Sequence, residues 1–287
     1  MPNTREIRRR IKSVQSTAKI TKAMEMVAAS KMRRAQERVL AARPYAEKMA
    51  EILAHLASQP LEEDIPHPLL RRRETQRIEI VHVTPDRGLC GGLNANINRS
   101  TSSFILQSNG VSTSVVTVGK KGRDFMTRYG RDVRAVFTDL GDRPNVVDIL
   151  PIARIIIDDY TSGFADVVYL AYSRFITTTN QTPVMNQILP VEPAKVEDMK
   201  QSGYIYEPSA TAVMDELLPR FVEMQVYHAV LESIASEQSA RMVAMRNATD
   251  NAEDMIDDLT LVYNRTRQEM ITGELLDITS GVEALEG

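Results

Sequence analysis

Apolar side chains recur in alternating steps of four and three residues from Ile7 to Leu56. A period of 3.5 residues is typical of a coiled coil, and no glycine occurs before residue 88. Pro44 removes a backbone donor, which predicts a kink or a restart of the helix there. The stripe, in which only Thr21 and Glu25 are polar, comprises Ile7, Ile11, Val14, Ala18, Thr21, Glu25, Ala28, Met32, Ala35, Val39, Ala42, Ala46, Met49, Leu53 and Leu56. We therefore expect one long helix over residues 1–57.

The same alternation returns from Leu217 to Met270, where four of sixteen positions are polar. Gly273 lies late in this segment, at a cost of about 1 kcal/mol relative to alanine. A long helix whose apolar stripe has no partner is unstable, and each segment offers the other a matching stripe. The pattern therefore predicts that residues 1–57 and 210–287 pair as an antiparallel coiled coil.

Between the two helices the pattern changes to short β-rich runs that alternate with helical segments. Strands are expected at 78–84, 112–119, 134–138, 166–176 and 184–191, and helices at 94–107, 120–129 and 145–160, the last kinked by Pro151. This order is typical of a mainly parallel sheet with helices on its faces. The predicted fold is α/β: a Rossmann-like domain over 77–192, inserted between the helices through joints at 58–76 and 193–209.

Composition narrows the class of protein. Of the 287 residues, 43% are hydrophobic and 25% charged, which suits a globular chain and excludes a disordered one. No run of 18 apolar residues occurs, and the first residues lack the apolar core of a signal peptide, so we expect no membrane span and no secretion. Cys90 is the only cysteine. An internal disulfide is therefore excluded, as is a cysteine cluster for zinc.

Charge is distributed unevenly along the chain. Residues 1–57 hold thirteen Lys or Arg and five Glu, a net charge of +8, whereas residues 211–287 hold five Arg and fifteen Asp or Glu, a net charge of -10. Opposite charges on two helices favour their pairing. Two separately solvated faces would give the same totals, so charge alone leaves both interpretations open.

The strongest candidate for chemistry is the turn DRGLCGG, Asp86–Gly92. A glycine-rich turn between a strand and a helix is where such sheets bind phosphates, but the spacing matches neither dinucleotide nor P-loop motifs. A structural turn with a buried Cys90 thiol is the simpler interpretation. The histidines, at positions 55, 67, 82 and 228, lack ligand spacing, and Asp158 and Asp159 lack a third ligand. The basic helix lacks the interleaved aromatics of a nucleic-acid surface. We expect no catalytic residue, metal site, cofactor or nucleic acid.

Four long motifs carry a resemblance to a known family. They are IRRRIKSVQSTAKITKAMEMVAASKMRRAQ (7–36), DRGLCGGLNANI (86–97), SEQSARMVAMRNATDNA (236–252) and LVYNRTRQEMITGELLDITSG (261–281). In this order they closely resemble the gamma subunits of F-type ATP synthases over essentially the whole chain.

The resemblance implies a function. In that family the paired helices are a rotating shaft inside a hexamer of three alpha and three beta subunits, and the insert joins the epsilon subunit and the membrane ring of c subunits. Proton flow turns the ring and shaft, and the shaft drives ATP synthesis, or the reverse hydrolysis, at catalytic sites on the beta subunits. This chain would then have no independent active site. We expect a peripheral protein on the cytoplasmic face of a bacterial plasma membrane.

The resemblance also implies positions of contact with the stator. The contacts to the beta subunits, and the region that tunes coupling, would lie at Lys22, Met24, Arg267, Gln268, Thr272 and Glu274. Arg241 would belong to a patch against the N-terminal helix. The simpler alternative for each is a solvated helix residue or ordinary packing between the helices.

The chain departs from the family pattern in a few places. Gly273, the acidic ending VEALEG and Pro85 are unusual, and the cysteine pair of plant chloroplast members is absent. Two other functions stay open on the sequence alone. One is a static coiled-coil scaffold, and the other is an α/β module that binds nucleotide through Asp86–Gly92.

Overall fold

The computed structural model describes residues 4–58, 67–108, 110–192, 206–207 and 209–286. Much of the two expected joints, at 59–66 and 193–205, lies outside the described residues. The chain divides into two compact units, one of Met1–Val27 with Met242–Gly287 and the other of Ala28–Arg241.

The chain begins and ends with long helices. Helix α1 spans Thr4–Ser58 and helix α5 spans Ala210–Glu286. Pro44 lies inside α1 and Pro219 inside α5; of the kink or restart expected at Pro44, the restart does not occur, because α1 is continuous. The missing donor at one position costs one hydrogen bond, which the packing on either side of Pro44 outweighs.

The apolar stripe of α1 is shielded from solvent along its whole length. All fifteen positions, Thr21 and Glu25 included, are buried or half-buried. The stripe of α5 is equally shielded from Leu217 to Thr266, but Met270 is 46% exposed. The stripe of α5 therefore ends one step earlier than its sequence pattern predicts.

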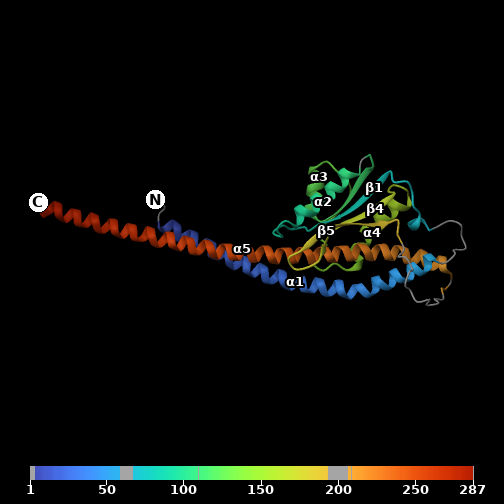
Figure 1. The fold of residues 1–287 in the computed structure, drawn as a ribbon, viewed down its shortest axis with the longest axis horizontal. Coiled ribbons are helices and arrows are strands. Elements are labelled where there is room, and N and C mark those ends of the chain that lie inside the picture. The colour runs from blue at the N-terminus through green and yellow to red at the C-terminus, as the bar shows by residue number, and fades with distance from the viewer. Residues whose placement is uncertain (1–3, 59–66, 109, 193–205, 208, 287) are drawn as a thin grey trace. The chain divides into compact units, whose positions relative to one another are not determined.

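The chain segment between the two helices forms one sheet of five strands (Figure 1). Their order is β3-β2-β1-β4-β5, and only β5 runs antiparallel to its neighbour. The strands are β1 (Arg77–Val83), β2 (Ser112–Val118), β3 (Asp132–Phe137), β4 (Val167–Phe175) and β5 (Gln181–Leu189). The predicted, mainly parallel sheet is confirmed, and each strand overlaps the run of residues that predicted it.

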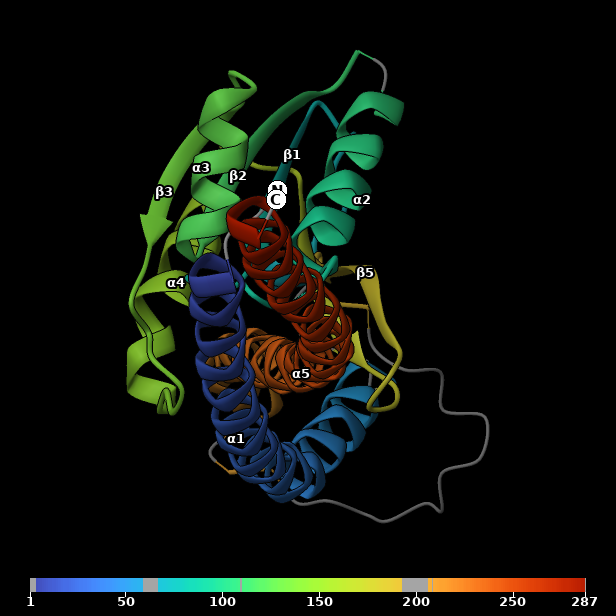
Figure 2. The ribbon, with the colours of Figure 1, turned by 90° about the vertical axis from the view of Figure 1, so that its left-hand side faces the viewer.

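Helices cover both faces of the sheet. They are α2 (Leu93–Gln107), α3 (Lys120–Arg128) and α4 (Val146–Thr161), and a short 3-10 turn, η1 (Pro68–Leu70), precedes β1. Helices α2 and α3 pack on the face that carries Ile80 and Val115, whereas α4 and the middle of α5 pack on the face that carries Val81 and Val116 (Figure 2). Helix α4 continues through Pro151. Alternate residues of the central strands thus enter two separate cores.

The middle of α5 is buried around most of its circumference. Val222, Val226, Ala229 and Val230 join the core under the sheet, although none of them belongs to the stripe that the sequence pattern picked out. A helix that is apolar on more than one side must be covered on more than one side. This second face of α5 is what attaches the helix to the α/β domain.

Candidate functional site

Three side-chain contacts join the two helix segments of the smaller unit. They are Arg8 Nη2 to Tyr263 Oη at 2.6 Å, Thr21 Oγ1 to Thr249 Oγ1 at 2.8 Å, and Arg246 Nε to Glu25 Oε1 at 3.0 Å. As the residue number rises along α1, the number of its partner on α5 falls. The two segments of this unit therefore run in opposite directions.

The two polar positions of the α1 stripe are engaged in contacts rather than left as gaps. The side chain of Glu25 is only 9% exposed and accepts hydrogen bonds from Lys22 Nζ and Arg246 Nε, each at 3.0 Å. The hydrogen bond from Lys22, followed by that from Arg246, outweighs burial and lowers the pKa of Glu25. Glu25 lies one turn from the Thr21–Thr249 pair. If one segment slipped by one turn along the other, the Glu25 carboxylate and the Thr21 hydroxyl would be buried without partners, so these contacts favour a single register.

The stator contacts expected on α1 differ in exposure. The Lys22 side chain is 58% exposed and donates its hydrogen bond to Glu25, while Met24 is half-buried. Large apolar neighbours are more exposed than Met24, with Met26 at 67% and Ile20 at 60%. A methionine with one side packed and the other open suits an adaptable protein contact.

The expected contacts on α5 lie at its exposed end. Arg267, Gln268, Thr272 and Glu274 are all exposed, and within the described chain no hydrogen bond or ion pair engages their side chains. Apolar residues share this end, each between 46% and 64% exposed: Met270, Ile271, Leu275, Leu276, Ile278 and Val282. Such a concentration of exposed apolar side chains is typical of a surface that another protein covers. Sequence reasoning named the polar contacts and missed this apolar group, whose signal was the loss of the 3.5-residue period after Met270.

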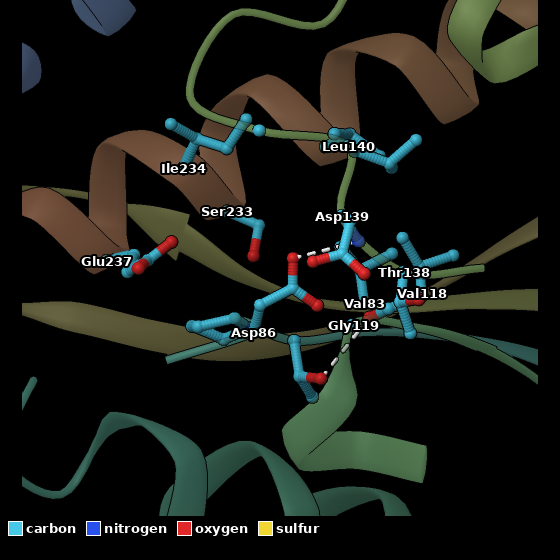
Figure 3. A pocket seen from close by; sticks show the side chains of 14 residues that line it. Val83, Asp86, Val118, Gly119, Thr138, Asp139, Leu140, Ser233, Ile234 and Glu237 are labelled. Carbon is cyan, nitrogen blue, oxygen red and sulfur yellow. Dashed lines mark hydrogen bonds between the residues drawn. The ribbon is translucent and has the colours of Figure 1, made fainter. Parts of the chain in front are cut away.

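The glycine-rich turn lies at the carboxyl edge of the sheet, beside a hollow that β1, β2 and β3 share (Figure 3). Asp86 organises this edge, because its Oδ1 accepts from the backbone N–H of Lys120 at 2.9 Å and its Oδ2 from that of Asp139 at 3.0 Å. One carboxylate thereby joins the loops that follow three parallel strands. Gly119 has a φ of +100° and is so close to Thr84 that a Cβ would overlap the Thr84 carbonyl oxygen.

Helix α5 closes this edge from the other side. Ser233, Ile234 and Glu237 of α5 line the same hollow as Asp86, as Figure 3 shows. Its volume is about 40 Å³, enough for one or two water molecules at about 30 Å³ each but not for a nucleotide. In open α/β folds the carboxyl edge is where ligands bind. Here the chain's own helix occupies that position, which disfavours the nucleotide-binding alternative.

Three hydrogen bonds attach α5 to main-chain carbonyls at this edge. Ser236 Oγ donates to the Ser173 carbonyl at 2.8 Å and Ser239 Oγ to the Thr178 carbonyl at 2.7 Å. Arg241 Nη2 donates to the Gly88 carbonyl at 3.1 Å and to Glu237 Oε1 at 2.6 Å. The described bonds of Arg241 thus go to the turn and to its own helix, and the expected contact with the N-terminal helix stays a prediction.

Cys90 is inert in this setting. It is 1% exposed, and its burial raises the pKa of the thiol, which disfavours the reactive thiolate. Leu89 beside it has a φ of +62° and is 64% exposed. The turn is therefore held by Asp86 and Arg241, with its thiol turned inward, as the structural interpretation predicted.

Two buried titratable groups lie on opposite faces of β1. His82 faces α2, where Nε2 lies 2.8 Å from Asn98 Oδ1 and Nδ1 3.1 Å from Thr101 Oγ1, and burial lowers the pKa of His82 to about 4. Glu79 faces α4 and is fully buried; neither carboxylate oxygen has a hydrogen-bond partner. Burial, followed by the nearby carboxylate of Asp159, raises the pKa of Glu79 to about 8.

Neither a cluster of metal-ligating side chains nor a membrane-spanning helix occurs among the residues that the structure describes. No group of three or more His, Cys, Asp or Glu side chains there could hold a metal ion. Within the same residues, no helix is both long enough and apolar enough to cross a membrane.

Comparison with known proteins supplies the family. A family model described as ATP synthase matches residues 3–285. An ATP synthase gamma chain from Dehalococcoides mccartyi is 59% identical over 285 residues, which are 99% of this chain and all of the relative. One from Herpetosiphon aurantiacus is 49% identical and covers 99% of both chains. The chain belongs to the ATP synthase gamma-chain family.

Solved structures agree with membership of the gamma-chain family. A chain from the central stalk and c ring of the Tetrahymena thermophila mitochondrial ATP synthase is 25% identical, with a TM-score of 0.61, and covers 80% of this chain and 99% of that one. A chain from the Euglena gracilis mitochondrial ATP synthase is 20% identical, with a TM-score of 0.68 over 98% of this chain and 94% of that one, a likeness of fold. This chain's fold, with long terminal helices and a mixed sheet, is thus shared with chains of these solved ATP synthases.

Proposed function

We propose that this gamma chain is the central rotor shaft of a proton-translocating ATP synthase. Its partners would be a hexamer of three alpha and three beta subunits, an epsilon subunit and a ring of c subunits. Catalysis would take place on the beta subunits, and the gamma chain itself would need no cofactor. The observation that carries this proposal is the full-length match to ATP synthase gamma chains. The bacterial relatives support a place on the cytoplasmic face of the plasma membrane, reached through the complex.

The shaft of this proposal is an antiparallel coiled coil of residues 1–57 and 210–287. Its support is the shielding of all fifteen stripe positions on α1 and the antiparallel order of the Arg8, Thr21 and Glu25 contacts. The α/β domain over 77–192 would then be a lateral insert. Most of it packs on the second apolar face of α5, which leaves the stripe available for α1.

The proposed stator contacts are Lys22, Met24, Arg267, Gln268, Thr272 and Glu274. Exposure supports all of them except Met24, which is half-buried. A contact that forms and breaks as the shaft turns needs groups that are satisfied in water as well as against a partner, and exposed charged and polar side chains meet that need. The exposed apolar residues that follow Met270 would complete the same surface.

A reversible crosslink tests the rotor. In a Cys90→Ser background, Lys22→Cys would be oxidised to a single cysteine placed in an acidic loop of the beta subunit. A matched control carries Arg99→Cys, an exposed position on α2. The complex is isolated first, and light scattering after gel filtration checks for one gamma chain per hexamer. We expect ATP turnover to stop when the Lys22→Cys crosslink forms and to return when a thiol reduces it.

The same experiment distinguishes the alternatives. A static scaffold would keep its turnover with the crosslink in place. A chain that stays outside the hexamer, or binds it in several copies without changing turnover, would contradict a shaft of any kind. Equilibrium dialysis of the isolated chain against ATP addresses the nucleotide-binding alternative, for which we expect no ATP binding that a change in the Asp86–Gly92 turn abolishes.

A further inference from the structure

A hollow rich in positive charge lies between α1 and the loop that joins β3 to α4. We call it the cation pocket; its lining residues are Lys31, Arg34, Ala35, Arg38, Asp142 and Arg143. The four from α1 are spaced by three, four and seven residues, so they follow one face of that helix. This face adjoins the stripe, because Ala35 is itself a buried stripe residue.

Only one of the four cations in the pocket is neutralised. Lys31 Nζ lies 2.6 Å from Asp142 Oδ2, and Gln238 donates to the other oxygen of Asp142 at 3.4 Å. Asp142 is therefore fully engaged. For Arg34, Arg38 and Arg143, no hydrogen bond or ion pair is present among the residues that the structure describes. Three guanidinium groups face a shared space with no carboxylate of their own.

Arg38 contributes an unsatisfied hydrogen-bond donor to the pocket. Its Nη1 is shielded from solvent and has no hydrogen-bond acceptor. A shielded donor that lacks an acceptor costs roughly 1 to 3 kcal/mol, and more when it is charged. An acceptor that enters the pocket would remove this cost, whereas an exposed arginine gains little from a new partner.

The chemistry of the pocket fits a compact anion with several oxygens. Guanidinium groups bind phosphate through paired N–H donors, which fixes both distance and orientation. The hollow has a volume of about 370 Å³, ample for a phosphate group. We propose that the cation pocket binds an oxyanion of the phosphate class, with Arg38 as its buried donor. The oxyanion is either free phosphate or the phosphate chain of a nucleotide, and this inference does not depend on the rotor function.

Isothermal titration calorimetry of the full-length chain tests the proposal. Inorganic phosphate, pyrophosphate and ATP are titrated separately at one constant ionic strength, because screening alone changes the affinity of any basic surface. Arg38→Gln removes the buried donor. Arg33→Gln is the matched control, since it removes the same charge from an exposed neighbouring position on α1 outside the pocket. Asp142→Asn acts in the opposite direction, because it releases Lys31 toward the pocket.

We expect Arg38→Gln to weaken phosphate binding by about tenfold or more, as the loss of a charged hydrogen bond should. Arg33→Gln should change it by less than about twofold. Asp142→Asn should tighten binding, a result that poor folding of a variant does not produce. Tighter binding of ATP than of pyrophosphate would assign the site to a nucleotide, and equal binding would assign it to the phosphate groups alone.

Three results would overturn the proposal. One is an equal loss in Arg38→Gln and Arg33→Gln, which would mean nonspecific attraction. Another is unchanged or weaker binding in Asp142→Asn. The third is saturable binding of a glutamate-rich peptide at Arg38 with no binding of any of the three oxyanions, which would make the pocket a protein-contact surface.

Discussion

Replacing Glu79 by glutamine removes an ionisable group that is fully buried in the middle of the sheet, next to the carboxylate of Asp159. Glu79 is fully buried on β1, and its strand neighbour on β2 is Ser114, whose hydroxyl is also buried without a partner. The nearest charges are Asp159 on α4 and Arg134 on β3, which bind each other through two hydrogen bonds of 3.0 and 3.1 Å. Arg134 is thereby committed to Asp159. Its positive charge offsets only part of the cost of ionising Glu79.

The size and sign of the effect follow from proton linkage. The pKa of Glu79 rises from 4.5 to about 8 in the folded chain. Between these two values the folded chain holds one proton more than the unfolded chain. The free energy of unfolding of the α/β domain therefore falls by about 1.4 kcal/mol per pH unit over this interval. Its stability is fully present below pH 4.5 and is lost as the pH rises through 8. The Glu79→Gln variant has no such slope.

The assay is urea unfolding of the full-length chain from pH 5 to pH 9, followed by tyrosine fluorescence, because Tyr160 and Tyr172 are buried in this domain. At pH 5 the variant and the wild type should differ by less than about 1 kcal/mol, since both carry a neutral side chain at position 79. By pH 9 the variant should be the more stable by about 4 kcal/mol. Glu216→Gln, an exposed change on α5, is the matched control and should follow the wild type at every pH.

Comparison of the two proteins at each pH removes the effects of other titrating groups, His82 among them. Parallel curves for wild type and Glu79→Gln from pH 5 to pH 9 would refute the reasoning, because they would mean that Glu79 ionises alike in the folded and unfolded chains. If the parallel curves were also offset, with the variant less stable by a constant amount, the side chain would contribute through packing rather than through its proton.

Three further predictions concern other parts of the chain. The wild type should lose about 3 kcal/mol of stability as the pH falls from 6.5 to 4, because the pKa of His82 is lowered to about 4 and only the unfolded chain takes up a proton in this interval. His82→Gln should abolish this loss in the same urea assay extended down to pH 4. Gly273→Ala should stabilise the end of α5 by roughly 1 kcal/mol, measured by hydrogen exchange, since nothing lies within 4 Å of a Cβ at that position; faster exchange would contradict it. The double variant Thr21→Val, Thr249→Val should lose less stability, measured by thermal unfolding, than the sum of the losses of the two single variants, because either single change already removes the contact between the two hydroxyls. Strict additivity would show that the 2.8 Å contact contributes nothing to stability.

The elements of this fold are legible in the sequence because each depends on local pattern. Every position of α1 that the 3.5-residue period marked is shielded, and β-branched runs marked the five strands. Thr21 and Glu25 looked like interruptions of the stripe, because their partners, Thr249 and Arg246, are more than 200 residues away. Local periodicity contains no information on which residues of two helices far apart in the sequence lie opposite each other. It therefore could not predict these polar pairs.

The carboxyl edge of the sheet was harder to predict for a related reason. The turn Asp86–Gly92 had the composition of a ligand site, and only the position of α5 against it gives it a structural role. A signal for this packing was present in the sequence, because Val222, Val226 and Val230 form a second apolar face on α5. The first apolar face was sufficient to predict the helix, so the second was not interpreted. The stator contacts stay predictions, since partner chains and not this chain determine them.

The three hydrogen bonds from α5 to carbonyls of the sheet edge have a mechanical consequence. A helix advances about 1.5 Å and turns about 100° with each residue, so a displacement of α5 by a single residue would break the bonds of Ser236, Ser239 and Arg241 together. Apolar side chains alone would tolerate small sliding movements. These bonds instead fix α5 against strand β4 and two loops at its edge of the sheet, in both translation and rotation, so a torque about the helix axis passes directly into their backbone.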